Sequence, residues 1–223
     1  MSEALKLWAR RIADALALEP GTVFVDAGAG SGVLTSAVAE LSGARAIAVD
    51  PEPRPQLPGI ERLTAFAERL PLKTASVHGI LFSHTLHHMT EPRKAVAEAK
   101  RVLKPGGRIA IRTATHADLR ANPHAKWYPT IQSAALAVTP DIGLLAVWIR
   151  DADLDIDYVE TVTTPFEGNL ADYEQSVVDL AVRDWALSPR GHRHPEQAAR
   201  QWVRDRFTRP PDVQETLIVA LHP

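Results

Sequence analysis

The stretch Val23–Thr35, VFVDAGAGSGVLT, decides the fold of this chain of 223 residues. It begins with an apolar run that is typical of a buried strand and ends on Asp26. Three alternating glycines, Gly28, Gly30 and Gly32, follow at once, and an amphipathic helix comes after them. Such a strand, glycine turn and helix bring backbone N–H groups and the positive end of a helix dipole against an anionic, nucleotide-like ligand. The sequence therefore predicts an α/β fold with a nucleotide-type cofactor at this turn.

The spacing of the glycines separates two kinds of cofactor. Dinucleotide-binding turns follow G-x-G-x-x-G, but here that third position is Val33 and the glycine falls one residue earlier, at Gly32. An acid, Asp26, also stands two residues before the first glycine. This D-x-G-x-G-x-G pattern resembles the first motif of class I S-adenosylmethionine (SAM) dependent methyltransferases. Glycine-rich segments also form ordinary tight turns, so the resemblance needs further motifs from the rest of the chain.

A second acid stands where a ribose would lie. Ala46–Asp50, AIAVD, is a short apolar run that ends on a carboxylate, and Asp50 comes 20 residues after Gly30. An acid at that distance accepts hydrogen bonds from ribose hydroxyls. The alternative is an exposed aspartate at a strand end. SAM and NAD sites share this feature, so it indicates adenosine more than either cofactor, and an NAD-dependent oxidoreductase is kept as an alternative.

Three further runs complete the pattern. They are TAFAERLP (64–71), a buried strand VHGILF (77–82) followed by the pair His87–His88, and RVLKPGG (101–107) before the strand RIAIRT (108–113). With these, the segment from Val23 to Thr113 resembles the large methyltransferase family that includes ubiquinone/menaquinone C-methyltransferases and many natural-product methyltransferases. The resemblance implies SAM as cofactor and S-adenosylhomocysteine as product.

The resemblance also implies a cofactor site built from the glycine turn, the second strand end and two later loops. Its residues would be Asp26, Ala27, Gly28, Gly30, Gly32, Asp50, Pro51, Phe66, Ala67, Glu68, Ser83 and His88. The family commonly has an aspartate where this chain has Phe66, and that aspartate contacts the adenine amino group. Phe66 cannot accept a hydrogen bond, so it either stacks on the adenine, leaving Glu68 or backbone to read the amino group, or packs in the core.

The expected architecture is a Rossmann-like, seven-stranded, mostly parallel sheet with helices on both faces and a small helical lid. The chain reads as one domain, 1–223, with an N-terminal helix (1–19), a SAM-binding core (20–113) and lid segments at 114–156 and 167–212. Within the first lid segment, residues 114–126 are expected to form a loop. The run ETLIVAL (215–221) resembles the final antiparallel strand of the family.

Composition excludes several classes of protein. A formal net charge of −2 argues against a nucleic-acid surface, and the absence of cysteine excludes disulfides and thiolate metal sites. No apolar run approaches the roughly 20 residues of a membrane span, and the acids near the N-terminus argue against a signal peptide. We expect a cytoplasmic monomer or homodimer without nucleic-acid or membrane partners and without a metal, although His84, His87 and His88 have helical spacing.

The residues that would bind or deprotonate the methyl acceptor are less clearly indicated by the sequence. His84 is the candidate general base, since histidine titrates near neutrality, and its alternative is a packing role. Arg112, on an otherwise apolar strand, either anchors a substrate carboxylate or forms a structural ion pair. Three aromatic residues are expected either to line the substrate pocket or to pack in the core: Trp127, Tyr128 and Trp148.

The sequence therefore predicts a SAM-dependent methyltransferase for a small, apolar or aromatic molecule, which bears a carboxylate if Arg112 is its anchor. Two alternatives stay open: an enzyme of the same fold that binds SAM but performs a non-methylating reaction, and a partner or regulatory subunit with a degenerate site. Methyl transfer asks mainly for alignment in a dry pocket, because the sulfonium already activates the methyl group. No sequence motif therefore identifies the methyl acceptor.

Overall fold

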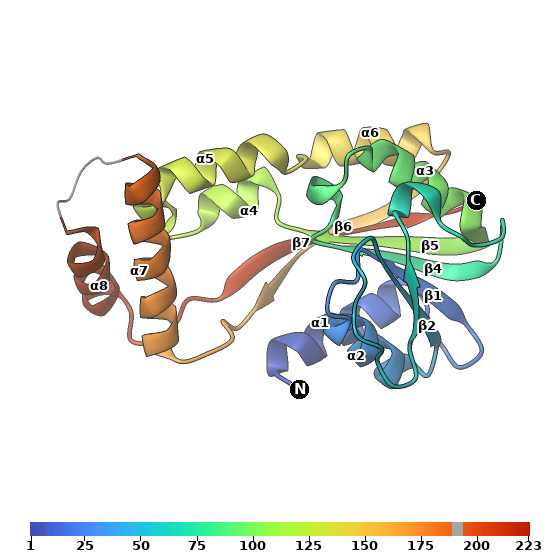
Figure 1. The fold of residues 1–223 in the computed structure, drawn as a ribbon, viewed down its shortest axis with the longest axis horizontal. Coiled ribbons are helices and arrows are strands. Elements are labelled where there is room, and N and C mark those ends of the chain that lie inside the picture. Colours follow the sequence, from blue (N-terminus) through green and yellow to red (C-terminus); the bar gives the residue numbers. More distant parts are fainter. Residues whose placement is uncertain (189–193) are drawn as a thin grey trace.

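The core of the fold is one seven-stranded sheet (Figure 1). Its strands are β1 (Val23–Ala27), β2 (Arg45–Asp50), β3 (Glu61–Thr64), β4 (Val77–Ser83), β5 (Leu103–Thr113), β6 (Asp155–Thr164) and β7 (Val213–Leu221). They lie in the order β3-β2-β1-β4-β5-β7-β6, with β7 antiparallel to both of its neighbours and the other pairs parallel. The predicted sheet, including its antiparallel last strand, is confirmed. The computed structural model describes residues 1–188 and 194–223, so part of the predicted lid segment 167–212 lies outside the described residues.

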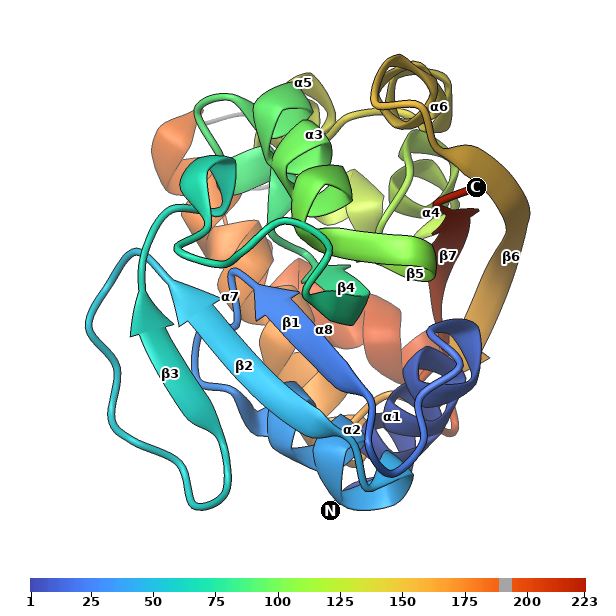
Figure 2. The same cartoon turned by 90° about the vertical axis from the view of Figure 1, so that its right-hand side faces the viewer.

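Helices cover both faces of this sheet, as the pattern of apolar residues predicts. The helices are α1 (Glu3–Ala15), α2 (Val33–Ser42), α3 (Pro92–Val102), α4 (His116–Ala121), α5 (Pro129–Val138), α6 (Ile142–Asp151), α7 (Leu170–Leu187) and α8 (Pro195–Arg206), with short 3-10 turns η1 (Ala67–Arg69), η2 (Leu86–His88) and η3 (Ala125–Trp127). Figure 2 shows the sheet from its end, with α1 and α2 on one side and α3 and α6 on the other.

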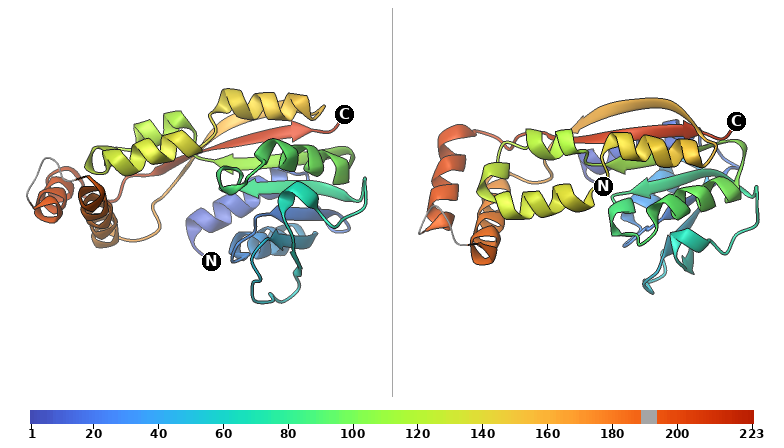
Figure 3. Two further views of the ribbon diagram at one scale, coloured as in Figure 1. Left: turned by 45° about the horizontal axis from the view of Figure 1, so that its top comes forward. Right: turned by 90° about the horizontal axis from the view of Figure 1, so that it is seen from above.

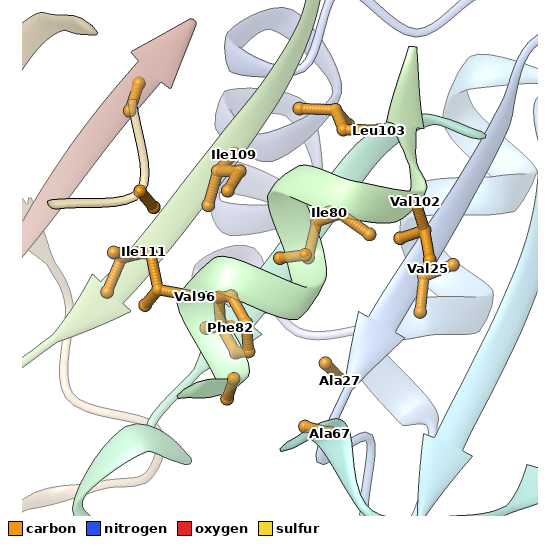
Figure 4. Close-up of a cluster of buried hydrophobic side chains, with 14 of the residues drawn as sticks. Val25, Ala27, Ala67, Ile80, Phe82, Val96, Val102, Leu103, Ile109 and Ile111 are labelled. Carbon is orange, nitrogen blue, oxygen red and sulfur yellow. The ribbon is translucent and has the colours of Figure 1, made fainter. Parts of the chain in front are cut away.

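Two hydrophobic clusters hold these layers together. Because successive residues of a strand point to opposite faces, Phe24 joins Trp8 and Ile12 of α1 on one face, whereas Val25 joins the cluster under α3 and α6 on the other. Figure 4 shows this second cluster, in which Val102 of α3 lies by Val25 and Val96 lies nearer to Phe82 and Ile111. Each sheet face is thus buried by helices, which is what a largely parallel sheet requires.

A smaller group of helices lies beyond the carboxyl ends of the parallel strands, at the left of Figure 1. We call it the helical arm; it comprises α4, η3, α5, α7 and α8. Tyr173, Val177 and Trp202 are buried in its own apolar cluster, and Glu174 binds Arg200 and Arg204 at 2.6 and 2.8 Å. Figure 3 shows in two views that the arm projects from the sheet at the end to which β5 leads. The arm falls within the predicted lid segments 114–156 and 167–212, but α6, in the first of them, packs on the sheet instead. The function of the arm as a lid stays a proposal.

The structure corrects the expectation of a loop at 114–126. His116–Ala121 is helical because Thr115 caps the helix with its hydroxyl, while the Asp118 carboxylate accepts from the Thr115 backbone N–H. This reciprocal capping box outweighs the polar composition of the segment. The spacing of Thr115 and Asp118, three positions apart, is the feature of the sequence that indicates this helix start.

One described stretch, Pro129–Asp151, is long and apolar enough by length and composition alone to cross a membrane. The expectation that no apolar run approaches the length of a membrane span is therefore wrong for this stretch. In the structure the stretch is two helices, α5 and α6, separated at Thr139–Asp141, and Asp141 caps α6 by accepting from the Leu144 N–H at 2.8 Å. Leu145 and Ile149 of α6 are fully buried against the sheet.

Candidate active site

The glycine turn between β1 and α2 adopts backbone conformations that favour glycine. Gly28, Gly30 and Gly32 have φ angles of 87°, 52° and 77°. The N–H groups of Gly28 and Ala29 donate to the Val49 carbonyl at 2.8 and 2.9 Å, which ties the turn to the end of β2. A methyl group on Gly30, in contrast, would meet nothing within 4 Å. The turn is therefore anchored at its start and open at Gly30, as a backbone cradle for a ligand requires.

Asp50 lies beside this cradle at the tip of β2. Its two carboxylate oxygens accept from the N–H groups of Gly30 and Glu52 at 2.8 and 3.0 Å, and Arg54 stands 3.7 Å away. A carboxylate has about four acceptor positions, so the two backbone bonds orient it and leave positions for ribose hydroxyls. Pro51, the next residue, is exposed. The geometry fits the ribose-binding role that the spacing predicted.

Asp26, at the end of β1, carries a buried oxygen that the described residues leave unpaired. Thr35 donates its hydroxyl to Oδ2 at 2.5 Å, but Oδ1 has no hydrogen-bond partner in the described part of the chain, and the residue is 2% exposed. Burial raises the pKa of Asp26 to about 6, against the opposing effects of the Thr35 hydrogen bond and the Arg62 charge. An orphaned carboxylate oxygen beside a nucleotide cradle fits a ligand that brings positive charge or donors, as SAM does.

Replacing Asp26 by asparagine should therefore show that the ionised Asp26 carboxylate destabilises the ligand-free wild-type protein. The folded-state pKa is raised, so the stabilisation from this group is complete below its unfolded value of about 4 and is lost as pH rises through about 6. The shift corresponds to about 3 kcal/mol. We expect the Tm of Asp26→Asn, relative to wild type, to rise between pH 5 and pH 8. Thermal melts of both proteins at the two pH values test this, and a constant difference would contradict it.

The loop after β3 places Phe66 in solvent. Phe66 is 65% exposed and precedes η1, whereas Ala67 is buried in the core. Phe66 is therefore not the core residue that one alternative predicted, and its exposed ring is free to stack on a ligand. Glu68 is half-buried and accepts a long hydrogen bond from the Glu91 backbone N–H at 3.3 Å.

Two residues that contact the glycine turn were not among the predicted site residues. Arg62, on β3, donates to the carbonyl oxygens of Gly30 and Ser31 at 3.1 and 2.5 Å and so holds the turn from the side. Thr85 packs directly on Gly28, where an added Cβ would lie 1.9 Å from the threonine Oγ1. Neither residue stands in a local pattern; only the pairing of the strands brings them to the turn.

A charged cluster lies where β4, β5 and β7 end or begin on the same side of the sheet. His84 follows β4 with a φ of 52°, and its Nε2 contacts Glu215 Oε1 at very short range. Arg112, from β5, donates through Nε and Nη2 to Glu215 Oε2 at 3.1 and 2.8 Å. The guanidinium also stacks on Trp8 of α1, 4.4 Å from the ring centre. We call these four residues the His84 cluster.

Electrostatics keep the centre of this cluster negative. Burial by itself would raise the pKa of Glu215, but the His84 hydrogen bond and the Arg112 charge outweigh burial and lower it. Ser83, which pairs with Arg112 across β4 and β5, is half-buried. His88 is exposed, and its ring lies 4.0 Å from that of His87, whose pKa is lowered by burial and by the neighbouring histidines.

A cavity of about 330 Å³ adjoins the His84 cluster. Its wall includes Val33, the first residue of α2 after the glycine turn, as well as Trp8, Arg112 and Glu215. The other lining residues are Ser2, Ala4, Leu5, Thr164, Pro165, Glu167 and Val213. The cavity therefore lies between the N-terminal helix and the ends of β6 and β7, next to the cofactor cradle, and its wall combines apolar side chains with three charged ones.

Of the four predicted substrate residues, only Arg112 lines this cavity, and Glu215 already engages it. Trp127 lies in the helical arm, where its ring is 6.1 Å from that of Trp202. Tyr128 is buried there, and burial raises its pKa to about 12. Trp148, on α6, packs against the core of the sheet. The four residues are thus not brought together.

Comparison with known proteins agrees with this geometry. A family model described as a methyltransferase domain matches residues 25–111. An uncharacterized methyltransferase of Mycobacterium tuberculosis is 39% identical over 93 residues, which is 39% of this chain and 37% of that protein. The matched stretch thus spans well under half of that relative. A demethylmenaquinone methyltransferase of Renibacterium salmoninarum is 30% identical over 180 residues, covering 68% of this chain and 74% of the relative.

Solved structures extend the likeness over the whole fold. A protein assigned as a methyltransferase from an antibiotic biosynthesis pathway of Anabaena variabilis superposes with a TM-score of 0.71 at 20% identity, covering 95% of both chains. The geranyl diphosphate C-methyltransferase of Streptomyces coelicolor, solved with S-adenosylhomocysteine, gives a TM-score of 0.59 at 17% identity over 97% of this chain and 79% of its own. The chain belongs to the class I SAM-dependent methyltransferases, and its cofactor is S-adenosyl-L-methionine.

Proposed function

We propose that this protein methylates a small, largely apolar or aromatic molecule bound in the cavity beside the His84 cluster. The observation that carries the proposal is the position of His84: it lies at the carboxyl end of β4, bound to Glu215, and Glu215 lines a cavity whose wall also includes Val33, the residue directly after the glycine turn. In open α/β sheets, ligands bind at the carboxyl ends of the strands where the strand order reverses, here between β1 and β4.

The chain's own residues would hold the cofactor in a defined way. The open backbone at Gly30 and the carboxylate of Asp50 receive the adenosine part, and the exposed ring of Phe66 lies ready to stack on adenine. The unpaired oxygen of Asp26 would be available to a donor or positive charge of the cofactor. Bound SAM supplies a methyl carbon on a sulfonium, and the electron pair of the broken carbon–sulfur bond stays on sulfur.

On the acceptor side, His84 is proposed as the general base. A general base must lie within hydrogen-bond reach of the proton that it removes, and histidine is suited to this role near neutral pH. The acceptor atom gives its proton to His84 as it forms the new bond to carbon. Positioning of the acceptor and exclusion of water supply the rest of the rate enhancement.

A small-molecule acceptor is also supported by the relatives. The Renibacterium and Streptomyces proteins are named for demethylmenaquinone and geranyl diphosphate. A cavity of about 330 Å³ lies at the lower end of the size range of small-molecule sites. The helical arm, beyond the strand ends, is proposed to cover the bound acceptor, and the cytoplasm is the proposed location.

A product screen tests this proposal. Purified protein is incubated with SAM and a panel of phenols, quinols, amines and carboxylic acids, and products are analysed by mass spectrometry for one added methyl group. A methylated product supports the proposal. S-adenosylhomocysteine binding without any methylated product would favour the non-methylating or partner-subunit alternatives.

The role of Asp50 is tested separately by cofactor binding. Asp50→Ala should weaken S-adenosylhomocysteine binding by about 1.5–3 kcal/mol, because a charge-assisted hydrogen bond to the ribose is lost. That corresponds to about a 10- to 150-fold rise in Kd, measured by calorimetric titration. The matched control is Glu52→Ala, which removes an exposed carboxylate two residues away that binds Arg54 at 2.6 Å. Equal affinity of Asp50→Ala and wild type would remove Asp50 from the site.

A further inference from the structure

Arg62, on β3, is an arginine whose hydrogen bonds go to backbone and not to an acid. Its guanidinium donates from Nη1 to the Gly30 carbonyl at 3.1 Å and from Nη2 to the Ser31 carbonyl at 2.5 Å. Within the described residues it forms no ion pair, and its Nε is buried without a hydrogen-bond partner. A cation and an unpaired donor next to the site of a cationic cofactor are both unfavourable. These costs indicate that the two carbonyl contacts matter for the glycine turn that they hold.

The register of three strands explains how Arg62 reaches this turn. Asp26 on β1 pairs with Ala48 on β2, and Ala48 pairs with Arg62 on β3, so the three side chains share one face of the sheet. Because the turn follows β1, the arginine side chain has to cross β2 to reach it. Ala48 is buried and small, which leaves room for this crossing. The row of Asp26, Ala48 and Arg62 thus directs the guanidinium to the turn.

The two carbonyl bonds also fix the direction of an N–H group. A trans peptide is planar, and its C=O and N–H point in opposite directions. The Gly30 carbonyl shares a peptide with the Ser31 N–H, so Arg62 directs that N–H to the side opposite itself. The Ser31 N–H has no hydrogen-bond partner among residues 1–188 and 194–223, whereas the Gly32 N–H donates within the turn to the Ala29 carbonyl at 2.8 Å. Arg62 therefore holds one free donor of the turn in a fixed direction.

We infer that Arg62 is a positioning residue for the cofactor, which holds the two peptide planes from Gly30 to Gly32 so that the turn is in its binding conformation before the cofactor arrives. In this conformation the Gly30 N–H orients the Asp50 carboxylate by donating to Oδ2 at 2.8 Å. The Ser31 N–H stays available to an acceptor oxygen of the ligand. The inference rests on SAM as the cofactor and is independent of the methyl acceptor.

A planar guanidinium suits this task better than an ammonium group. Arginine presents its N–H donors in one rigid plane, so its two Nη groups bind two successive carbonyls at once, whereas the ammonium of lysine is a point charge on a flexible stem. The close approach of the guanidinium also explains a glycine of the turn. A Cβ added to Gly32 would lie 2.5 Å from Arg62 Nη2. Arg62 and Gly32 therefore fit each other as a pair.

The first experiment follows two amides of the turn directly and needs no cofactor. Gly28 and Gly30 are the two glycines of the sequence that follow an alanine. In protein labelled with nitrogen-15 glycine and carbonyl-carbon-13 alanine, NMR therefore selects these two amides among 12 glycines, and Gly30→Ala identifies the Gly30 signal by its loss. We expect Arg62→Met, which keeps an apolar stem but no donor, to speed the exchange of the Gly30 N–H with water by at least about 10-fold. The Gly28 N–H, bound to the Val49 carbonyl at 2.8 Å, should change by less than about twofold.

Arg45→Met is the matched control. It makes the same replacement on the neighbouring strand β2, where Arg45 binds Glu61 at 2.5 Å, and it should leave both amides unchanged. Equal acceleration at Gly28 and Gly30 in Arg62→Met would show a general loosening of the fold and overturn the positioning role, as would an unchanged Gly30. If Arg62→Met does not fold, Arg62→Lys decides by the same criteria, because it keeps the charge but lacks the planar guanidinium.

The second experiment measures cofactor binding by calorimetric titration with S-adenosylhomocysteine. Arg62→Met should raise the Kd by about 5- to 30-fold, which is the cost of ordering the backbone of one residue when the ligand binds. Arg62→Lys should fall between wild type and Arg62→Met, and Arg45→Met should stay within about twofold of wild type. Wild-type affinity in Arg62→Met or Arg62→Lys would overturn the inference. Because the titration uses no acceptor, that result would leave the proposed methylation of a small molecule standing.

Discussion

Replacing His84 by asparagine should lower turnover by about 10²- to 10⁴-fold with the acceptor found in the product screen, because a general base contributes about that much. Asparagine is the suitable replacement, since His84 has a φ of 52° and asparagine tolerates this left-handed conformation better than most residues. The loss should fall on kcat, while the affinity for S-adenosylhomocysteine stays within about twofold, since the ring is assigned to the acceptor. Steady-state kinetics and calorimetry on one preparation measure both.

His87→Asn is the matched control. It changes the same side chain three residues away, on η2, and this ring stacks on His88 rather than contacting Glu215. Its turnover should stay within about threefold of wild type. Full activity of His84→Asn would end the base assignment, whereas equal losses in the two variants would show that any disturbance of this turn is harmful.

Gly28→Ala should lower the free energy of unfolding by about 2–4 kcal/mol, which is about 5–15 °C in Tm for a chain of this size. Two costs add. The backbone has a φ of 87°, which is strained for alanine, and the new methyl carbon would lie 1.9 Å from Thr85 Oγ1 and 2.7 Å from its Cβ. Neither atom can move easily, because Thr85 is buried at the start of η2. Thermal or urea unfolding of the ligand-free protein measures the loss.

Gly21→Ala separates the two costs. Gly21 has a similar φ of 95°, but a methyl group there would meet nothing within 4 Å, so only the backbone strain of about 1–2 kcal/mol remains. The steric part should also be relieved in the double variant Gly28→Ala/Thr85→Gly, which should lose less than the sum of its two single changes. Equal losses for Gly28→Ala and Gly21→Ala would mean that Thr85 does not limit the turn.

The glycine turn and the acid beside it could be predicted because both are encoded locally. Gly28, Gly30 and Gly32 lie within five consecutive positions, and their positive φ angles follow from residue type. Asp50 lies at a strand end that the apolar run before it marks, and β1 and β2 pair in register from Val23 with Arg45 onward, which brings Asp50 to the turn. In such βα units, local periodicity and the parallel pairing of strands determine where the ligand lies.

The acceptor half depended on contacts between residues far apart in the chain. Glu215 is 131 positions from His84 and 103 from Arg112, and no periodicity relates them. An acid at the start of the otherwise apolar run of β7 was a signal of a buried charge, but its partners follow only from the antiparallel register of β5 and β7. The same holds for Arg62, which reaches the glycine turn because β3 pairs with β2.

The chain's local patterns thus decided its strands and helices, the glycine turn and the place of Asp50, because each depends on residues that are close together in the sequence. Only the tertiary structure decided where the residues predicted to bind the acceptor lie. Packing assigned Trp148 to the core of the sheet and Trp127 to the helical arm, since an aromatic side chain buries its area wherever the fold offers an apolar partner. The register of the strands places Arg112 beside Glu215. A buried charge needs a counter-charge that is close in space, and that partner can be far away in the sequence.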